Sequence, residues 1–291
     1  MTPIAIFAFN RPKELSDMLA SLKQNPLFEE SEKYIFIDGP RNDKDAELIK
    51  EVEQIAHAVT DNVKLSPQNK GLGSSIIAGV SEVLSHHNSV IVLEDDLRLM
   101  PGFLTYMNEA LEHFKDDERI LAVCGYSLKI KTPKDYKSSI YLGDRTSSWG
   151  WGTWRDRWEK VDWDVSDWEE FSNNKKEITR FNQCGSDMFG MLNDYMEGRN
   201  RSWAIRFCYH QFKHGLYSAH PVKSLVDNEG FGETATNCRQ KYNRFKIELT
   251  DSIDLKVKGE LEPNKSLMRQ LHRYHSIPIR IYSRIRKILN V

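Results

Sequence analysis

The sequence predicts an α/β fold in which a mostly parallel sheet is covered by helices on both faces. Short apolar runs alternate with segments of helical spacing over the first 125 residues. The run Val90–Leu93 is aliphatic throughout, as in a strand that is buried on both faces. A regular order of strand and helix predicts parallel strands joined by helical crossovers.

The elements follow in a regular order. The runs that predict strands are Pro3–Phe9, Tyr34–Ile37, Val63–Leu65, Val90–Leu93 and Ile120–Cys124. Apolar residues three or four positions apart predict helices over 15–22, 48–56, 76–84 and 103–114. Pro12 and Pro101 stand near the starts of the first and last of these helices, where the fixed φ of proline favours a first turn.

The composition is that of an ordinary globular protein, with 40% hydrophobic and 29% charged residues among 291. No apolar run has the length of a membrane span, and the N-terminus leads directly into a strand without a signal peptide. The four cysteines are widely spaced and form no metal-binding pattern. We therefore expect a cytoplasmic protein.

Three consecutive acids, Glu94, Asp95 and Asp96, follow the buried strand Val90–Leu93 directly. Ligands of open α/β sheets bind outside the carboxyl ends of the strands. Carboxylates crowded there repel one another unless a cation lies among them, and their hard oxygens suit Mg²⁺ or Mn²⁺ completed by substrate phosphates. The alternative is a solvated junction between a strand and a loop.

Other nucleotide and hydrolase motifs are absent from the sequence. The first strand is followed by Asn10-Arg11-Pro12 and not by the G-x-G-x-x-G of dinucleotide-binding domains. The chain contains no P-loop and no G-x-S-x-G nucleophile motif. These absences favour a nucleotide fold that holds phosphates with side chains and a metal.

The ordered strand ends resemble those of GT-A fold glycosyltransferases. One strand leads into Asn10-Arg11, the next into Asp38 and a later one into the three acids. The loop 69–73 resembles the N-x-G segment of bacterial family 2 transferases. The acidic run, followed by a proline and a phenylalanine that open a helix, is similar to the motif of N-acetylglucosaminyltransferase I. The resemblance covers residues 3–240.

This resemblance implies roles for the residues at the strand ends. Asp96 would ligate a divalent cation, Mn²⁺ or Mg²⁺, that bridges the phosphates of a nucleotide-sugar. The remaining donor-binding residues would be Glu94, Asp95, Asp38 at the base, Arg11 at the phosphate or the base, and Lys70. The alternative for Arg11 and Asp38 is an ion pair with each other that shapes two adjacent loops.

Six of the seven tryptophans lie between residues 147 and 168. Trp149 and Trp151 alternate with glycines, which suits a loop in which a ring approaches a ligand closely. We expect both rings to contact the acceptor, and the segment resembles the Trp-Gly acceptor loop of several GT-A enzymes. Packing in the core is the alternative, and Trp154 and Trp158 fit one buried helix face.

An inverting transferase needs a general base, and Asp187 is the leading prediction because it begins a helix beyond the Trp-Gly segment. Its alternative role is that of a helix N-cap. The other carboxylates considered are Asp194, Asp227, Glu229 and Glu233. Two features depart from related sequences: Ala204 replaces a carboxylate, and Asn237 or Cys238 stands where a metal-binding histidine is common. We expect residues 225–232 to form a closing loop and His220 to be structural.

The C-terminal residues 264–291 contain seven Lys/Arg and no acid, which leaves 34 basic and 42 acidic residues in the rest of the chain. Isoleucines and leucines alternate with these cations, and Pro278 divides the segment. A basic amphipathic helix suits an anionic membrane surface, here the inner face of the cytoplasmic membrane. The alternative is a helix docked on the acidic body. We expect no nucleic-acid binding.

The prediction is therefore one catalytic domain with a nucleotide-sugar-binding half, 1–125, an acceptor-binding half, 126–245, and a basic helical extension, 246–291. It would transfer a sugar from a nucleotide-sugar, with UDP the expected nucleotide, to a glycan or lipid-linked acceptor. Metal dependence and inversion are the expectations from the resemblance. The alternatives are a sugar nucleotidyltransferase and an inactive nucleotide-sugar-binding module.

Overall fold

The computed structural model describes residues 1–231, 244–245, 247, 249–257 and 260–289. Its main sheet has the strand order β3-β2-β1-β4-β8-β6-β9-β7, and β10 pairs with β5 in a second, two-stranded sheet. The strands are β1 Ile4–Ala8, β2 Lys33–Ile37, β3 Val63–Leu65, β4 Ser89–Glu94, β5 Leu97–Leu99, β6 Ile120–Cys124, β7 Ile140–Gly143, β8 Trp151–Trp154, β9 Tyr217–Pro221 and β10 Val226–Asn228.

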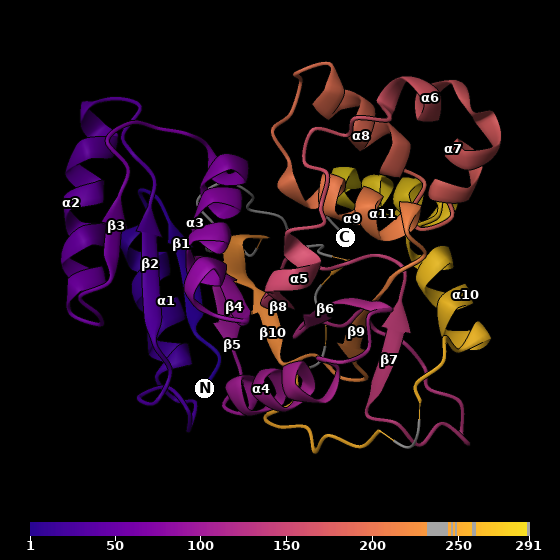
Figure 1. Ribbon diagram of the computed structural model, residues 1–291, viewed down its shortest axis with the longest axis horizontal. Coiled ribbons are helices and arrows are strands. Elements are labelled where there is room, and N and C mark those ends of the chain that lie inside the picture. The colour runs from indigo at the N-terminus through magenta and orange to yellow at the C-terminus, as the bar shows by residue number, and fades with distance from the viewer. Residues whose placement is uncertain (232–243, 246, 248, 258–259, 290–291) are drawn as a thin grey trace.

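Helices cover both faces of the main sheet, as Figure 1 shows. The helices are α1 Pro12–Leu22, α2 Asp43–His57, α3 Leu72–His86, α4 Phe103–His113, α5 Arg155–Trp158, α6 Trp168–Asn173, α7 Lys175–Phe181, α8 Met188–Met196, α9 Trp203–Lys213, α10 Lys265–Tyr274 and α11 Ile277–Leu289. The buried sides of α1, α2 and α4 share one hydrophobic cluster, and those of α3, α5 and α9 share a second on the opposite face. The predicted α/β architecture is confirmed.

Alternation along β1 explains how one strand serves both layers. Ile4 and Ile6 belong to the first cluster, while Ala5 and Phe7 belong to the second, and all four are buried. A strand with apolar residues at every position can bury both of its faces in this way.

The right-hand half of the sheet is mixed and not parallel throughout. β8 lies between β4 and β6 and is antiparallel to both, with Ser89 opposite Trp154 and Cys124 opposite Trp151. The other pairs between β3 and β4 are parallel. The strand predicted after the acids, β6, is therefore separated from β4 by a strand from the tryptophan-rich segment.

The C-terminal extension is docked on the body over much of its length. Leu267 and Leu271 of α10 are buried against Tyr141 of β7. Gln270 accepts a hydrogen bond from the backbone N of Lys131 at 2.8 Å and donates one to the Lys131 carbonyl at 2.9 Å. The helix α10 is therefore packed against the body of the protein, which corrects the expectation that residues from 264 onward are free to bind a membrane.

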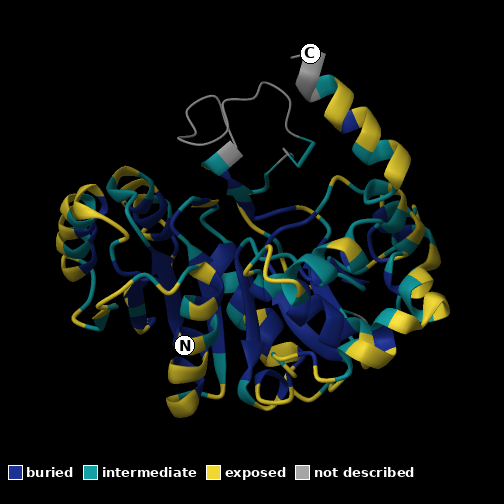
Figure 2. Ribbon diagram, turned by 90° about the horizontal axis from the view of Figure 1, so that it is seen from above, coloured by how far each residue is buried: buried dark blue, intermediate teal, exposed yellow. Residues whose placement is uncertain are grey.

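The last helix, α11, is different because it extends away from the body in Figure 2. Its apolar residues Ile277, Ile281, Tyr282 and Ile285 are 60%, 54%, 52% and 49% exposed. Among the described residues, no helix combines the length and the hydrophobicity that a membrane crossing requires.

The ion pair between His272 and Asp144 joins α10 to the body and depends on pH. Nε2 of His272 lies 2.6 Å from Oδ2 of Asp144, and this hydrogen bond and charge raise the pKa of His272. The stabilisation is complete below the unfolded-state pKa of about 6.5 and is lost as the pH rises through the higher folded value.

We therefore expect His272→Gln to lower the free energy of unfolding by about 0.5 kcal/mol more at pH 6 than at pH 9, because this partly exposed pair is screened by solvent. Urea unfolding of both proteins at the two pH values measures this difference. An equal effect at both pH values would show that the charge of His272 contributes nothing.

Candidate active site

The ends of three neighbouring strands bring the predicted donor residues together. In the order β2-β1-β4, Ile37 lies opposite Ala8, and Phe7 lies opposite Glu94. Residues that follow these strands therefore meet at one edge of the sheet. This edge holds Arg11, Asp38 and the three acids.

Arg11 is held by the acidic motif. Its Nη2 and Nε donate to the two carboxylate oxygens of Asp95, the latter at 3.3 Å, and its Nη1 donates to Oδ2 of Asp96 at 3.1 Å. The planar guanidinium thus bridges two carboxylates, which relieves the repulsion that the sequence predicts. Asp95 is buried, whereas 14% of the Asp96 side chain is exposed.

Protonation further lowers the charge of the acidic motif. Burial, together with the charges of Asp96 and Asp95, raises the pKa of Glu94 to about 8. Burial raises the pKa of Asp95 to about 6 although Arg11 opposes the shift. Burial and the neighbouring carboxylates therefore favour the protonated form of Glu94, which lowers the negative charge of the motif.

Asp38 holds the loop 69–73 and makes no ion pair with Arg11. Its carboxylate accepts hydrogen bonds from the backbone N of Lys70 and of Gly71, both at 2.8 Å, and from Nδ2 of Asn69 at 3.1 Å. The proposed Arg11–Asp38 ion pair is therefore wrong. Asp38 is buried, and its carboxylate shapes the loop that precedes α3.

Two cations lie at the same loop, one on the loop itself and one from the segment before α9. The side chain of Lys70 is exposed. A Cβ atom at Gly71 would lie 3.8 Å from Nη1 of Arg201, so this guanidinium lies against the loop. Arg201 precedes α9 and joins Arg11 and Lys70 as a cation near the strand ends.

The side chains at the end of β4 could hold a metal ion jointly with a substrate. Among the described residues, no group of three or more His, Cys, Asp or Glu side chains is arranged to hold an ion. Asp96 is the more exposed aspartate of the motif, with Arg11 on one oxygen and Asn228 at 3.2 Å from the other. Magnesium sites commonly use one or two carboxylates with phosphate oxygens, and this site fits that arrangement and not an all-protein cage.

The segment after Leu225 closes over the acidic motif as a strand and a short 3-10 helix, Glu229–Phe231. The backbone N of Glu229 donates to the Asp96 carbonyl at 2.9 Å, and a Cβ at Gly230 would come within 2.8 Å of Oδ2 of Asp96. A side chain at this position would displace the Asp96 carboxylate. Because residues 226–228 pair with β5, the first part of the predicted closing loop is a strand. Gly232, Glu233, Asn237 and Cys238 lie outside the described residues.

Trp151 belongs to the core. Its side chain is 0% exposed in β8, and its ring stacks on Trp203 at 4.8 Å between centroids and contacts Trp158 and Phe207. A ring with no exposed surface cannot contact an acceptor in this conformation. The prediction that Trp151 binds the acceptor is corrected, and the physical reason is that its loop is a central strand. Trp154 and Trp158 are also buried, but Trp154 lies in β8 and not on a helix.

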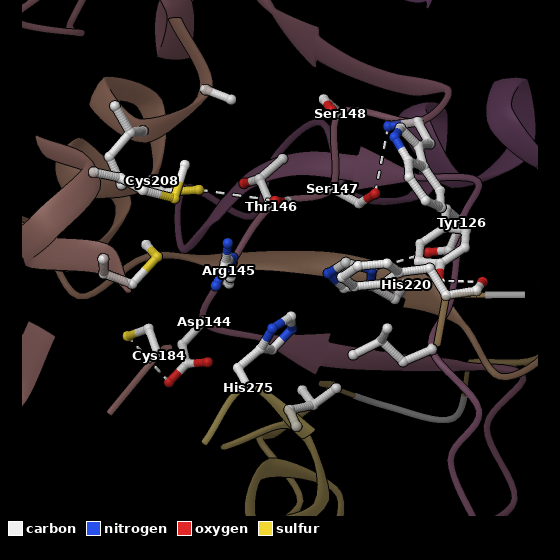
Figure 3. Close-up of a pocket in the computed structure, with 18 of the residues that line it drawn as sticks. Tyr126, Asp144, Arg145, Thr146, Ser147, Ser148, Cys184, Cys208, His220 and His275 are labelled. Atoms are coloured by element: carbon white, nitrogen blue, oxygen red, sulfur yellow. Dashed lines mark hydrogen bonds between the residues drawn. The ribbon is translucent and has the colours of Figure 1, made fainter. Parts of the chain in front are cut away.

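Trp149 lies in the wall of a cavity of about 340 Å³ (Figure 3). Its ring packs edge-on against Tyr126 at 4.6 Å and Phe245 at 5.8 Å between centroids. The cavity lies between the segment 144–149 and helices α8, α9 and α10. Gly150, which follows Trp149, lies against Val226, because a Cβ at Gly150 would meet Val226 at 3.0 Å. Val226 begins β10, and Asn228 at the end of this strand donates a hydrogen bond to Asp96.

Asp187 lies beside the cavity and is paired with an arginine. Its Oδ1 accepts from Nη1 of Arg145 at 3.1 Å, and it occupies the N-cap position of α8 without a side-chain capping bond. Burial by itself would raise the pKa of Asp187, but the charge and hydrogen bond of Arg145 and the charge of Arg280 lower it overall.

The other carboxylates lie in different surroundings. Asp194, on α8, forms an ion pair with Arg199, which follows that helix. Glu229 lies 3.8 Å from Arg98. Asp227 precedes Asn228, and its charge contributes to the raised pKa of Tyr126, for which burial is the main cause. His220 is buried, lies 3.2 Å from the Tyr126 carbonyl and stacks on Tyr141, which agrees with a structural role.

Several residues of the site were not predicted, namely Arg145, Arg201, Asn228, Arg244 and His275. The signal for Arg145 was available, because it follows the apolar strand Ile140–Gly143 as the acids follow β4. Asn228 reaches the site from β10, and the others reach it from helix ends and loops whose placement depends on tertiary packing.

Comparisons with known proteins identify the fold. The structure of GalNAc-T7 with UDP, GalNAc and Mn²⁺ superposes with a TM-score of 0.51 at 11% identity, over 78% of this chain and 43% of that one. TarS from S. aureus (residues 1–349) aligns at 14% identity over 53% of this chain and 47% of its own, with a TM-score of 0.39. The mannosyltransferase PcManGT from Pyrobaculum calidifontis, with GDP-Man and Mn²⁺, aligns at 11% identity over 56% and 47%, with a TM-score of 0.38.

The alignments span less than half the length of these three proteins. The sequence matches none of the curated proteins with which it was compared. Residues 4–186, more than half of the chain, match the sequence profile described as Glycosyl transferase family 2. Together with a GT-A fold and an acidic motif at the end of β4, this match shows that the chain is an enzyme of the glycosyltransferase type and belongs to glycosyl transferase family 2.

Proposed function

We propose that the protein transfers a sugar from a UDP-linked donor to an acceptor bound beside Trp149, with a divalent cation held by Asp96. The observation that carries the proposal is the pairing of Arg11 with Asp95 and Asp96 at the end of β4. GalNAc-T7, which shares the fold, binds UDP and Mn²⁺ in its solved structure, in agreement with this donor class.

Each group at the strand ends has a distinct task in this proposal. A bound metal supplies Lewis-acid stabilisation of the leaving diphosphate. Arg11 is kept in place by Asp95, so its guanidinium is fixed before the donor arrives and can stabilise developing negative charge. Lys70, on the loop that Asp38 shapes, and Arg201, which lies against this loop, add positive charge.

Hydrolysis of UDP-sugars in Mn²⁺ without an acceptor tests the proposal. We expect slow release of UDP from at least one UDP-sugar, and none when EDTA replaces the metal. A protein that only binds nucleotide-sugars would release nothing. A nucleotidyltransferase would instead form diphosphate from a sugar phosphate and a nucleoside triphosphate. Saturable binding of GDP with no response to UDP would contradict the proposed nucleotide.

We propose that the general base is either Asp187, which the sequence favours, or Asp227. Arg145 lowers the pKa of Asp187, which weakens it as a base, whereas Asp227 lies next to Asn228 and near Tyr126 at the rim of the cavity. We expect the asparagine variant of the true base to lower kcat by about 10²–10⁴ with an unchanged Kd for UDP.

The kinetics of Asp227→Asn and Asp187→Asn on the same acceptor distinguish the two. Asp194→Asn is the matched control, since Asp194 pairs with Arg199 on α8. A tenfold or smaller effect of both variants would show that neither carboxylate is the base.

We further propose that α11 binds an anionic membrane surface. Its exposed face of Ile277, Ile281, Tyr282 and Ile285 is accompanied by the exposed Arg284, and the helix contains no acid. Apolar burial at the headgroups and about 1 kcal/mol for each nearby cation would act together.

The double variant Ile281→Glu with Ile285→Glu is expected to lose binding to anionic vesicles in a flotation assay while it retains donor hydrolysis. Wild-type binding is expected to weaken as salt screens the cations. Leu65→Glu, at another exposed apolar residue, is the matched control. Unchanged vesicle binding by the double variant would contradict the membrane role of α11.

A further inference from the structure

The cavity beside Trp149 is positively charged at the side where α8 begins. Arg145 enters it from the segment after β7, and Figure 3 shows Arg145, His220 and His275 turned toward the same space. Its other walls are largely apolar and include Leu128, Met188, Met191, Ile205 and Leu271.

Two further arginines lie close to Arg145. Arg280 of α11 donates from Nη1 to Oγ of Ser186 at 3.2 Å, next to Asp187. The guanidinium of Arg244 lies over the ring of Phe245, which lines the cavity, at 4.4 Å from its centroid. The charges of Arg280 and Arg145 contribute, after burial, to a lowered pKa of Arg244, so the three cations repel one another. We call Arg145, Arg244 and Arg280 the arginine cluster.

The carboxylates nearby do not balance the arginine cluster. Asp187 accepts a hydrogen bond from Arg145. Burial, together with the charges of Arg145 and Arg244, lowers the pKa of His275 to about 3, so His275 is neutral and adds no charge. The other carboxylate in the cavity wall, Asp144, is occupied by His272 and by the thiol of Cys184. Within the part of the chain that the structure describes, the three guanidiniums therefore share one carboxylate, that of Asp187.

Two nitrogen atoms of this region are buried without a hydrogen-bond partner among the described residues. They are Nη1 of Arg244 and Nδ1 of His275. Buried polar groups are nearly always satisfied, so an unpartnered guanidinium nitrogen among further cations indicates a position where an anion would supply the acceptor.

We propose that the arginine cluster binds a phosphoryl group of the acceptor, so that the acceptor is a phosphate-bearing molecule whose remainder lies against the cavity walls. This inference rests on the proposed function for its place in the reaction. Guanidinium groups match the oxygens of a phosphate in pairs, and a phosphomonoester carries nearly two negative charges at neutral pH. The apolar walls suit an isoprenoid chain, and Trp149 suits a sugar, so the phosphate has two possible sources.

Binding measurements on the full-length protein test the proposal. Geranyl phosphate, glucose 1-phosphate and glucuronate are titrated calorimetrically, with UDP and Mn²⁺ present to occupy the donor site and again without them. We expect either phosphate ester to bind at least about tenfold more tightly than glucuronate, as charge-assisted bonds to a dianion predict. Tighter binding of geranyl phosphate identifies the isoprenoid source, and tighter binding of glucose 1-phosphate identifies the sugar source.

Variants on one helix give the matched comparison. Arg280→Gln is expected to weaken binding of the phosphate ester about tenfold or more, while Arg284→Gln, one turn away and exposed, changes it less than twofold. Arg145→Gln combined with Asp187→Asn removes the second cation without leaving its partner charge buried. Equal affinity of wild type and both cluster variants, or equal affinity for glucuronate, would overturn the proposal.

The donor reaction is measured separately on the same proteins. If Arg280→Gln loses the phosphate ester but still releases UDP from a UDP-sugar, the subsite and the proposed function both stand. If wild type releases UDP and binds no phosphate ester, only the phosphoryl subsite is wrong. If it binds the ester and shows neither UDP binding nor UDP release, the proposed donor chemistry fails and the subsite remains.

Discussion

Asp96→Ala is expected to abolish metal-dependent binding of UDP and to lower donor hydrolysis by about 10²–10³, the loss typical of one electrostatic group in a transition state. The reason is the position of Asp96 at the end of β4, where it is the more exposed of the motif's two aspartates. Calorimetric titration of UDP with and without Mn²⁺ measures the effect on binding.

The fold should survive this change. Asp96 accepts one hydrogen bond from Arg11 and one from Asn228, while Arg11 keeps its paired contacts with Asp95. Loss of two hydrogen bonds is offset by loss of repulsion from Asp95, so we expect the free energy of unfolding to change by no more than about 1 kcal/mol.

Asp61→Ala is the control, because Asp61 is exposed and precedes β3, a parallel strand, so it lies at the opposite edge of the sheet from the acidic motif. An unchanged affinity of Asp96→Ala for UDP in Mn²⁺ would remove the metal assignment. A protein that unfolds would instead show that Asp96 is needed to hold Arg11 and β10 together.

The strands and helices of the first 125 residues were predictable because their signals are local. A short apolar run rich in β-branched residues, such as β4, favours a buried strand, and α3 shows its buried face through residues three or four apart. The strand β8 was not predictable in this way. Its pairing with β4 joins residues about sixty positions apart, and its glycine and tryptophan residues have the composition of a loop.

Arg11, Asp38 and the three acids of the motif were predictable as a group, whereas their hydrogen-bond partners were not. The register of β2, β1 and β4 places all of them at one edge whatever the loops do. Which carboxylate Arg11 takes depends on the loop 69–73, whose backbone N–H groups occupy Asp38 and leave the guanidinium to Asp95 and Asp96. Competition between backbone and side-chain donors for one carboxylate cannot be predicted from the spacing of residues in the sequence.

The C-terminal extension illustrates a pattern with two physical meanings. A basic amphipathic helix can place its apolar face on lipid or on protein, and α10 and α11 share this pattern. The structure divides them: α10 buries Leu267 and Leu271, while α11 exposes its isoleucines. The cap that Asn264 provides to α10 is a local signal, but the apolar surface around Tyr141 that receives the helix forms only in the folded protein.

Trp151→Ala is expected to destabilise the protein by about 3–5 kcal/mol, the usual cost of removing a large buried ring. Trp151 is fully buried and packs among Trp203, Trp158 and Phe207 between the sheet and its helices. For a chain of this size the loss corresponds to a Tm lower by roughly 10 °C. Thermal unfolding followed by circular dichroism measures it.

Trp151→Phe separates packing from any polar role of the indole. The indole Nε1 of Trp151 is buried without a hydrogen-bond partner among the described residues, so phenylalanine loses volume but no hydrogen bond. We expect Trp151→Phe to retain most of the stability, with a cost of about 1–2 kcal/mol. A cost equal to that of alanine would show that the nitrogen has a partner in the folded protein.

Trp149→Ala should behave in the opposite way, because its ring is only partly buried and lines the cavity. Loss of the edge-on contacts with Tyr126 and Phe245 costs some stability, but the main effect should be a KM for the acceptor raised by about tenfold, with an unchanged Kd for UDP. If Trp149→Ala instead lowers the Tm as much as Trp151→Ala and leaves the acceptor KM unchanged, both rings serve the core. The acceptor would then be held by other walls of the cavity.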